Sequence, residues 1–171
     1  NRNCFIYCEY TGEGDETISH RLKEVLEKNC RMKPYEAVVI ESSYPAAAKR
    51  EAWMHQKAAE GARVFITNAK CVATGLDFAF SYLGKTYNYP TIIFYQTGYD
   101  MIKIWQASHR HYRLNQTEEC RTFFLVSERT IQLDAVRLVA TKEVATSAIQ
   151  GQFSSEGLST MARGVDPRVI L

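Results

Sequence analysis

The sequence predicts an α/β domain of three layers, with helices on both faces of a mainly parallel central sheet. Strand-like and helix-like segments alternate along most of the 171-residue chain, and such alternation implies β-α-β crossovers. The strand-like segments are continuously apolar, as expected for strands covered on both faces. The length suits one compact domain with a single core.

The first half of the chain contains three expected strands and two expected helices. The strands are short runs rich in aromatic and β-branched residues, at positions 4–10, 37–41 and 63–68. The helix expected over 16–29 places four apolar side chains on one face: Ile18, Leu22, Val25 and Leu26. The second helix, over 46–60, starts after Pro45 and stops at Gly61.

The second half continues the alternation. Strands are expected over 90–96 and 121–127, and a helix over 101–113. A longer helix over 130–150 places Ile131, Ala135, Leu138 and Val139 on one side. Residues 151–157 carry Gly, Gln and Ser, which predicts a linker or tail, so we expect a folded domain at 1–150 and a linker or C-terminal tail at 151–171.

The composition is that of a soluble globular protein, with 46% hydrophobic and 23% charged residues. The net charge of +2 neither favours nor excludes nucleic acid, because a local basic stripe is averaged out. No signal peptide or membrane-spanning run is visible, so we expect no membrane partner and a cytoplasmic or nucleoid-associated location. The chain begins at Asn1 directly before a strand and stops on an apolar run, so we expect a fragment of a longer protein, although processing also removes methionines.

The cysteines and histidines predict no metal site. Four of the five cysteines lie in or beside apolar runs, which indicates buried, reduced thiols: Cys4, Cys8, Cys71 and Cys120. A zinc knuckle at Cys4 and Cys8 would need a second ligand pair, and none is evident. His109 and His111 would point to different faces of a helix, and we expect all four histidines to be structural or surface residues.

One candidate site segment is 67–78, TNAKCVATGLDF, which follows an expected strand and therefore lies at the ligand-facing edge of the sheet. Thr67 offers a hydroxyl, Asn68 an amide and Asp77 a carboxylate, and Gly75 permits close backbone approach. Such a loop can hold a phosphate or a ribose. A well-capped turn between a strand and a helix uses the same residue types, so both interpretations stay open.

The other candidate segment is 106–116, QASHRHYRLNQ. On a helix, Gln106, Arg110 and Arg113 fall on one face. Arginine matches phosphate oxygens bidentately and stabilises charge that develops in phosphoryl transfer. An exposed basic face with ordinary ion pairs is the alternative. The chain contains no GxxxxGK[ST], GxSxG or HExxH sequence, which argues against a self-contained hydrolase.

Taken in order, these segments resemble the C-terminal RecA-like lobe of superfamily-2 helicases, nearest to the Swi/Snf-like DNA translocases. The resemblance runs from about residue 4 to about residue 140. The strand over 4–10 resembles motif IV, and Arg50 stands before the threonine-and-glycine loop as it often does in the family. Thr67 with Gly75-Leu76-Asp77 resembles motif V, and Gln106, Arg110 and Arg113 resemble motif VI, Q-x-x-x-R-x-x-R. Gln116-Thr117, the strand over 122–126 and the helix start at Thr130-Ile131 resemble the stretch that follows motif VI.

The resemblance implies catalytic roles for three residues. Arg110 and Arg113 would be arginine fingers that reach ATP, and Gln106 would sense the nucleotide state. ATP and Mg²⁺ would be held mainly by the N-terminal RecA-like lobe of the same parent chain, which these 171 residues do not include.

The resemblance also implies a nucleic-acid track, with DNA more expected than RNA. Thr67 and Asn68 would contact a nucleic-acid phosphate. Gly75 and Asp77 are assigned to the cofactor side, where Gly75 permits close approach and Asp77 links the nucleotide site to the track.

Three departures from the family pattern concern the subfamily. The family often has Gly where this chain has His109, and Gly where it has Asn115. Residues 78–89, FAFSYLGKTYNY, form a longer aromatic stretch than the usual link. This stretch is compatible with an insertion that packs on the first lobe or stacks on bases, and equally with an apolar flap over the sheet.

Two other functions remain open. The lobe is also compatible with a non-catalytic helicase-like scaffold or nucleic-acid-binding module, because the chain lacks a P-loop of its own. A stand-alone doubly wound protein that binds a small molecule is the third reading, since fold alone does not fix function.

Overall fold

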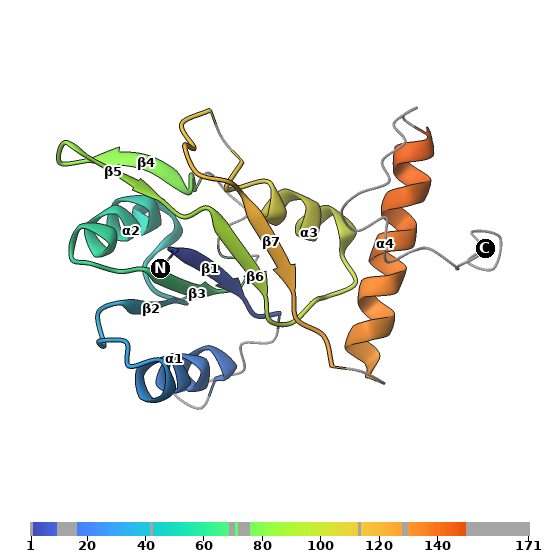
Figure 1. Cartoon of the computed structure of the whole chain (residues 1–171), viewed down its shortest axis with the longest axis horizontal. Helices are drawn as coiled ribbons and strands as arrows, with labels where there is room; N and C mark the ends of the chain where they lie inside the picture. The colour runs from blue at the N-terminus through green and yellow to red at the C-terminus, as the bar shows by residue number, and fades with distance from the viewer. Residues whose placement is uncertain are drawn as a thin grey trace.

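The computed structural model describes residues 2–9, 17–41, 43–68, 71, 76–112, 114–127 and 130–149. Its centre is a five-stranded sheet in the order β2-β3-β1-β6-β7, and all four strand pairings are parallel (Figure 1). The strands are β1 (Cys4–Tyr7), β2 (Ala37–Ile40), β3 (Val64–Thr67), β6 (Thr91–Phe94) and β7 (Arg121–Phe124). This sheet confirms the predicted α/β class and its parallel topology.

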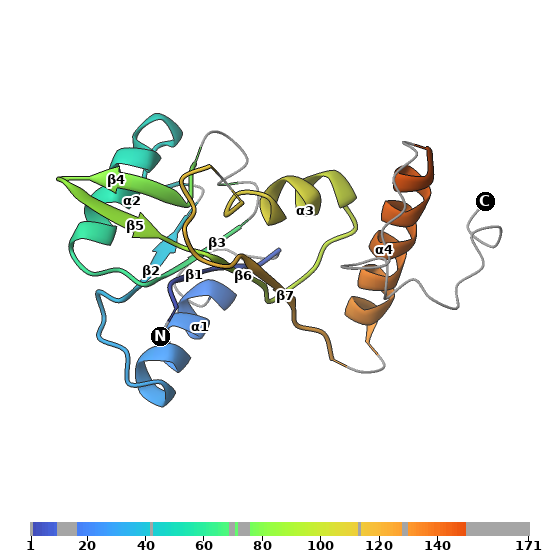
Figure 2. The ribbon, with the colours of Figure 1, turned by 45° about the horizontal axis from the view of Figure 1, so that its top comes forward.

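Helices flank the sheet on both sides, as Figure 2 shows. Helix α1 (Ile18–Asn29) covers one face, where Leu22 and Leu26 pack against Ile6 and Ile66. The opposite face is covered by α2 (Arg50–Ala59), by α3 (Met101–Ser108) and by a hairpin of β4 (Ala79–Tyr82) and β5 (Lys85–Asn88). The three layers follow from the period of two along each strand, which sends alternate side chains to opposite faces.

The aromatic stretch between Asp77 and Pro90 forms this hairpin. The Phe78 and Phe5 rings stack with centroids 3.5 Å apart, and the Tyr89 hydroxyl donates to the Ala62 carbonyl at 2.6 Å. Phe78 and Tyr89 are fully buried in the core on the α2 side of the sheet. The stretch is therefore an apolar flap over the sheet, one of the alternatives that the sequence left open.

The ends of the first two helices follow local capping chemistry. The Thr17 side chain accepts from the His20 amide, so α1 begins one residue after this cap. A short 3-10 turn, Ala47–Lys49, precedes α2 where the sequence predicted continuous helix. Gly61 has a φ of +108° and confirms the predicted stop, because this conformation is costly for residues with a Cβ.

Helix α3 ends at Ser108, and the prediction that it continues to residue 113 is wrong. The Trp105 carbonyl accepts from the Ser108 hydroxyl at 2.9 Å as well as from the His109 amide. The Arg110 amide bonds to the Ala107 carbonyl, three residues back, instead of continuing the α-helical ladder. These local bonds tighten and close the helix, so Arg110 lies in the turn after α3 and not on a helical face with Gln106.

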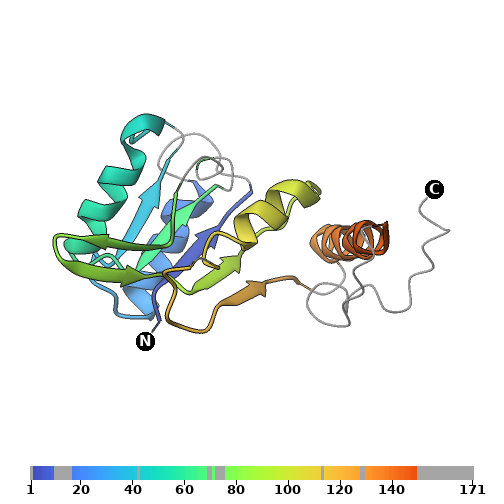
Figure 3. The ribbon, with the colours of Figure 1, turned by 90° about the horizontal axis from the view of Figure 1, so that it is seen from above.

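Helix α4 (Ile131–Ile149) lies beyond the β7 edge of the sheet (Figure 3). Its Val139 belongs to the same buried cluster as Ile104 and Ala107 of α3. The predicted apolar face is only partly buried, because Ile131 is exposed. Among the residues that the structure describes, no helix is long and apolar enough to cross a bilayer.

Candidate functional site

The carboxyl ends of the parallel strands meet at one edge of the sheet. The last residues of β1, β3 and β6 lie side by side, since Tyr7 pairs with both Thr67 and Phe94 in the strand register. Ligands of open α/β sheets bind beyond this edge. The segments that follow each strand therefore form the candidate site.

Thr67 and Asn68 are held tightly at the end of β3. The Thr67 hydroxyl is 0% exposed and donates to the Ile40 carbonyl of β2 at 3.2 Å. Asn68 is 8% exposed, and its amide nitrogen donates to the Glu9 carbonyl at 2.6 Å. Both side chains tie neighbouring strand ends together.

Arg50 joins three segments at the same edge. It begins α2 and is buried, and its guanidinium donates to the carbonyls of Glu41, Pro45 and Cys71. A buried guanidinium carries five donors in a fixed fork and is costly unless these are used. Arg50 therefore fixes the loop after β2 and the start of the loop after β3 relative to α2.

Asp77 lies at the end of the loop after β3, directly before the hairpin of β4 and β5. Its side chain is exposed, and it lies near His55 of α2, whose pKa its charge raises. Burial is the larger effect and lowers the His55 pKa overall. Gly75, the other residue assigned to the cofactor side, lies outside the described residues.

Arg110 is half-buried in the turn after α3 and lies near the buried end of Tyr7. Burial raises the pKa of the Tyr7 hydroxyl, and the Arg110 charge opposes that rise. Tyr7 is the last residue of β1, the central strand, so the Arg110 charge acts on the carboxyl end of this strand. Gln106 is exposed on α3, whereas Ile104 and Ala107 face the core. Arg113 lies outside the described residues.

Two hollows lie at this edge that the sequence did not point to. A small cavity of about 10 Å³ lies where Glu9, Gln96, Gly98 and Lys103 meet. A Cβ at Gly98 would come within 2.9 Å of the Glu9 carboxyl carbon, so glycine permits this close approach. An open groove of about 290 Å³ adjoins it on the side of β7, lined by residues that include Gln96, Leu125 and Gln132. The sequence analysis placed Glu9 and Gln96 inside the strands expected over 4–10 and 90–96, whereas β1 ends at Tyr7 and β6 at Phe94, so both residues were missed.

Cys4 and Cys8 are buried thiols in and directly after β1. Burial raises the pKa of both Cys4 and Cys8 to about 11, so these thiols are weak nucleophiles at neutral pH. Cys71 is also buried, whereas Cys120 is only half-buried. No group of three metal-ligating side chains occurs within the described ranges.

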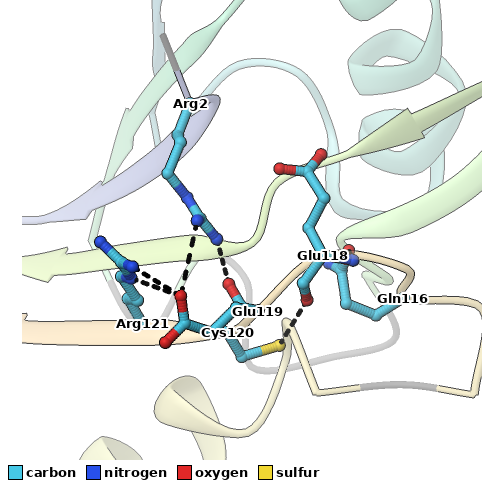
Figure 4. Close-up of polar contacts among 6 residues, drawn as sticks. All are labelled: Arg2, Gln116, Glu118, Glu119, Cys120 and Arg121. Carbon is cyan, nitrogen blue, oxygen red and sulfur yellow. Dashed lines mark hydrogen bonds and ion pairs between the residues drawn. The ribbon is translucent and has the colours of Figure 1, made fainter.

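The opposite edge of the sheet carries a cluster of charges that includes Arg2, Glu119 and Arg121 (Figure 4). Arg121 donates to the Glu119 carboxylate through two nitrogens, at 2.9 and 2.6 Å, and Arg2 donates to the Glu119 carbonyl. Nearby, the Asn88 amide at the end of the hairpin donates to the Thr117 hydroxyl at 2.9 Å. The segment that returns from α3 to β7 is thus tied to the amino end of the sheet.

Comparisons with known proteins match this fold and no sequence family. No family model matches the chain, and no curated protein matches it by sequence. Among solved structures 97 chains match, and one of them is the C-terminal part of the Fun30 ATPase domain. It has a TM-score of 0.58 and 15% sequence identity, over 98% of this chain and 44% of that chain. At this identity the likeness shows the fold alone, and the present chain spans less than half of the matched structure.

Proposed function

We propose that this chain is the C-terminal RecA-like lobe of an ATP-driven nucleic-acid translocase of the Swi/Snf-like kind. The observation that carries the proposal is the position of Arg110, half-buried and near Tyr7 at the carboxyl edge of a five-stranded parallel sheet. The similarity in fold to the C-terminal part of an ATPase domain supports it. The lobe comprises residues 1–150, and 151–171 form a linker or tail.

In this proposal the lobe supplies charge to a nucleotide held elsewhere. ATP and Mg²⁺ are bound mainly by the first lobe of the parent chain, and Mg²⁺ neutralises phosphate charge there. Arg110 and Arg113 reach into the cleft between the lobes and stabilise the charge that develops on the transferred phosphoryl group. Gln106 faces the same cleft from α3, and Gly75 and Asp77 complete the cofactor side.

The nucleic-acid track runs past the loop that follows β3. Thr67 and Asn68 are almost fully buried and bonded to neighbouring backbone, so we assign them the task of holding this loop against the phosphates. Cycles of ATP binding and hydrolysis close and open the cleft and move the lobe along the backbone. DNA is the preferred track.

ATP hydrolysis by the full-length parent tests the proposal. Hydrolysis should be stimulated by double-stranded DNA, single-stranded DNA or RNA. The nucleic acid that stimulates hydrolysis is then the one along which the protein moves. Arg110→Ala and Arg113→Ala should each lower kcat by about 10³-fold or more and leave nucleotide binding nearly unchanged, because the arginines act on the transition state.

Arg121→Ala is the matched control. Arg121 is exposed at the amino end of β7 and pairs with Glu119, so this variant should hydrolyse ATP like the wild type. Full activity in both Arg110→Ala and Arg113→Ala would contradict the arginine-finger role. A folded parent without hydrolysis under any condition would favour the non-catalytic scaffold. Tight nucleotide binding by this chain alone would favour the hypothesis of a stand-alone protein that binds a small molecule.

A further inference from the structure

His111 is a buried imidazole in the turn that carries Arg110. Its residue is 3% exposed, whereas its neighbours His109 and Tyr112 are exposed. A polar ring is buried in a surface turn only at a cost, so its contacts require an explanation.

The His111 ring lies between the end of α3 and strand β7. Its Nε2 is 3.5 Å from the Thr122 hydroxyl of β7, and the Ser108 carbonyl at the end of α3 raises its pKa. Burial is the larger effect and lowers the pKa to about 4, so the ring is neutral at pH 7. A neutral imidazole has one donor and one acceptor. The Thr122 hydroxyl is the partner of Nε2, whereas Nδ1 is buried with no hydrogen-bond partner in the part of the chain that the structure describes.

The backbone of His111 closes the segment that follows. Its carbonyl accepts from the Gln116 amide nitrogen at 3.4 Å and from the Cys120 thiol at 3.3 Å. Both donors come from the segment that Figure 4 shows leading into β7. The side chain bonds to β7 and the carbonyl bonds to the segment that leads into β7, so both connect the turn to this strand at one residue.

We infer that His111 is a positioning residue, which fixes the turn after α3 against β7 and so holds the Arg110 guanidinium at the carboxyl edge of the sheet. The inference rests on the proposed function for its catalytic consequence. The role of His111 in ordering the turn after α3 does not depend on the proposed function. Arg110 and His111 are adjacent in sequence, so a small shift of the His111 ring also displaces the Arg110 guanidinium.

Three substitutions separate positioning from general stability. His111→Leu keeps apolar volume and removes both ring nitrogens, whereas His111→Gln retains a donor and an acceptor. Thr122→Val removes the hydroxyl partner and keeps the branched side chain. Tyr112→Leu changes the exposed neighbour and is the matched control.

In the full-length parent, His111→Leu should lower kcat for ATP hydrolysis by about 10- to 100-fold, since a misplacement of about 1 Å is enough for such a loss. KM for ATP should change by less than about 2-fold, because the arginine acts mainly in the transition state. His111→Gln should recover much of the rate. Thr122→Val should lower kcat by less, and it should have little further effect in the His111→Leu background.

Amide hydrogen exchange of the full chain without nucleotide gives the second measurement. In His111→Leu, exchange of the segment 109–121 should become faster while β1 and β3 stay protected, and Tyr112→Leu should exchange like the wild type. Unchanged exchange in this segment would overturn the inference, whether or not the parent hydrolyses ATP. Loss of hydrolysis with equal loosening of β1 and β3 would also overturn it, because His111 would then be a general stability residue. A parent that never hydrolyses ATP refutes the proposed function, and exchange alone then decides the role of His111.

Discussion

The two halves of the sheet use their side chains differently. The hairpin half, which comprises β1, β2, β3, α2, β4 and β5, packs most of its aromatic side chains into one buried cluster. Its aromatic rings interlock, as in the stacks of Phe5 on Phe78 and of His55 on Phe80. Its polar side chains at the carboxyl edge, Thr67 and Arg50, donate to backbone carbonyls of the same half.

The arginine half, which comprises β6, β7, α3 and α4, is less complete. Apolar side chains stay exposed on α3, on the segment after it, on β7 and directly after β7, including Trp105, Tyr112, Leu114, Phe123 and Leu125. Figure 1 shows α4 beyond the β7 edge of the sheet. The half with the exposed surface also carries Gln106 and Arg110, which suits a lobe whose chemistry is completed by another part of a larger protein.

The largest expected difference between the halves is the cost of removing a phenylalanine ring. Phe78→Ala in the hairpin half should lower the free energy of unfolding by about 3–5 kcal/mol, because the ring is fully buried. Phe123→Ala in the arginine half should cost under about 1.5 kcal/mol, because that residue is 47% exposed. Urea unfolding measures both, and equal losses would contradict the comparison.

A second difference concerns acid sensitivity. Burial lowers the pKa of His111 to about 4 from the value of 6.5 that an unfolded chain has. Between these pH values the unfolded chain binds more protons, so the free energy of unfolding should fall as the pH falls from about 6.5 to about 4. The His111 contribution should be of the order of 3 kcal/mol.

The test compares urea unfolding of the wild type and of His111→Leu across this pH range. The pKa of His55 is lowered too, and it adds an acid-sensitive contribution of the same sign to both proteins. The difference between wild type and variant therefore isolates His111. Parallel pH profiles would show that the ring is not held in its neutral form.

The smallest effect concerns the one strained position at the tip of the hairpin. Leu83 is 79% exposed with a φ of +49°, and Gly84 follows with a φ of +75°. Asn adopts this conformation more readily than Leu and is preferred before Gly in such turns. Leu83→Asn should raise the free energy of unfolding by about 0.5–1 kcal/mol, measured as a rise in Tm. A lower Tm would mean that the Leu83 side chain makes a stabilising contact.

The sequence alone determined the order of the five sheet strands and of the four α-helices along the chain and the parallel class of the sheet, but it placed strand ends up to three residues too late and did not predict β4 and β5. These features depend on local patterns, such as the apolar run of β3 and the glycine stop at Gly61. They also gave the loop after β3 as a candidate site, whereas the turn that carries Arg110 was predicted as helix. Domain division, arginine fingers and track residues stay predictions.

Only the tertiary structure decided how the candidate residues are used. Thr67 and Asn68 have the residue types of a binding loop, but the packing of adjacent strand ends turns their polar groups inward. Helix α3 ends early because the Arg110 amide bonds to the Ala107 carbonyl instead of continuing the helical ladder. The Ser108 and His109 side chains also bond to the Trp105 carbonyl there, an effect that spacing between arginines does not reveal. His111 is buried because β7 passes beside the turn, and that contact joins residues 11 positions apart. Periodicity reports one element at a time, whereas these outcomes depend on which elements the fold brings together.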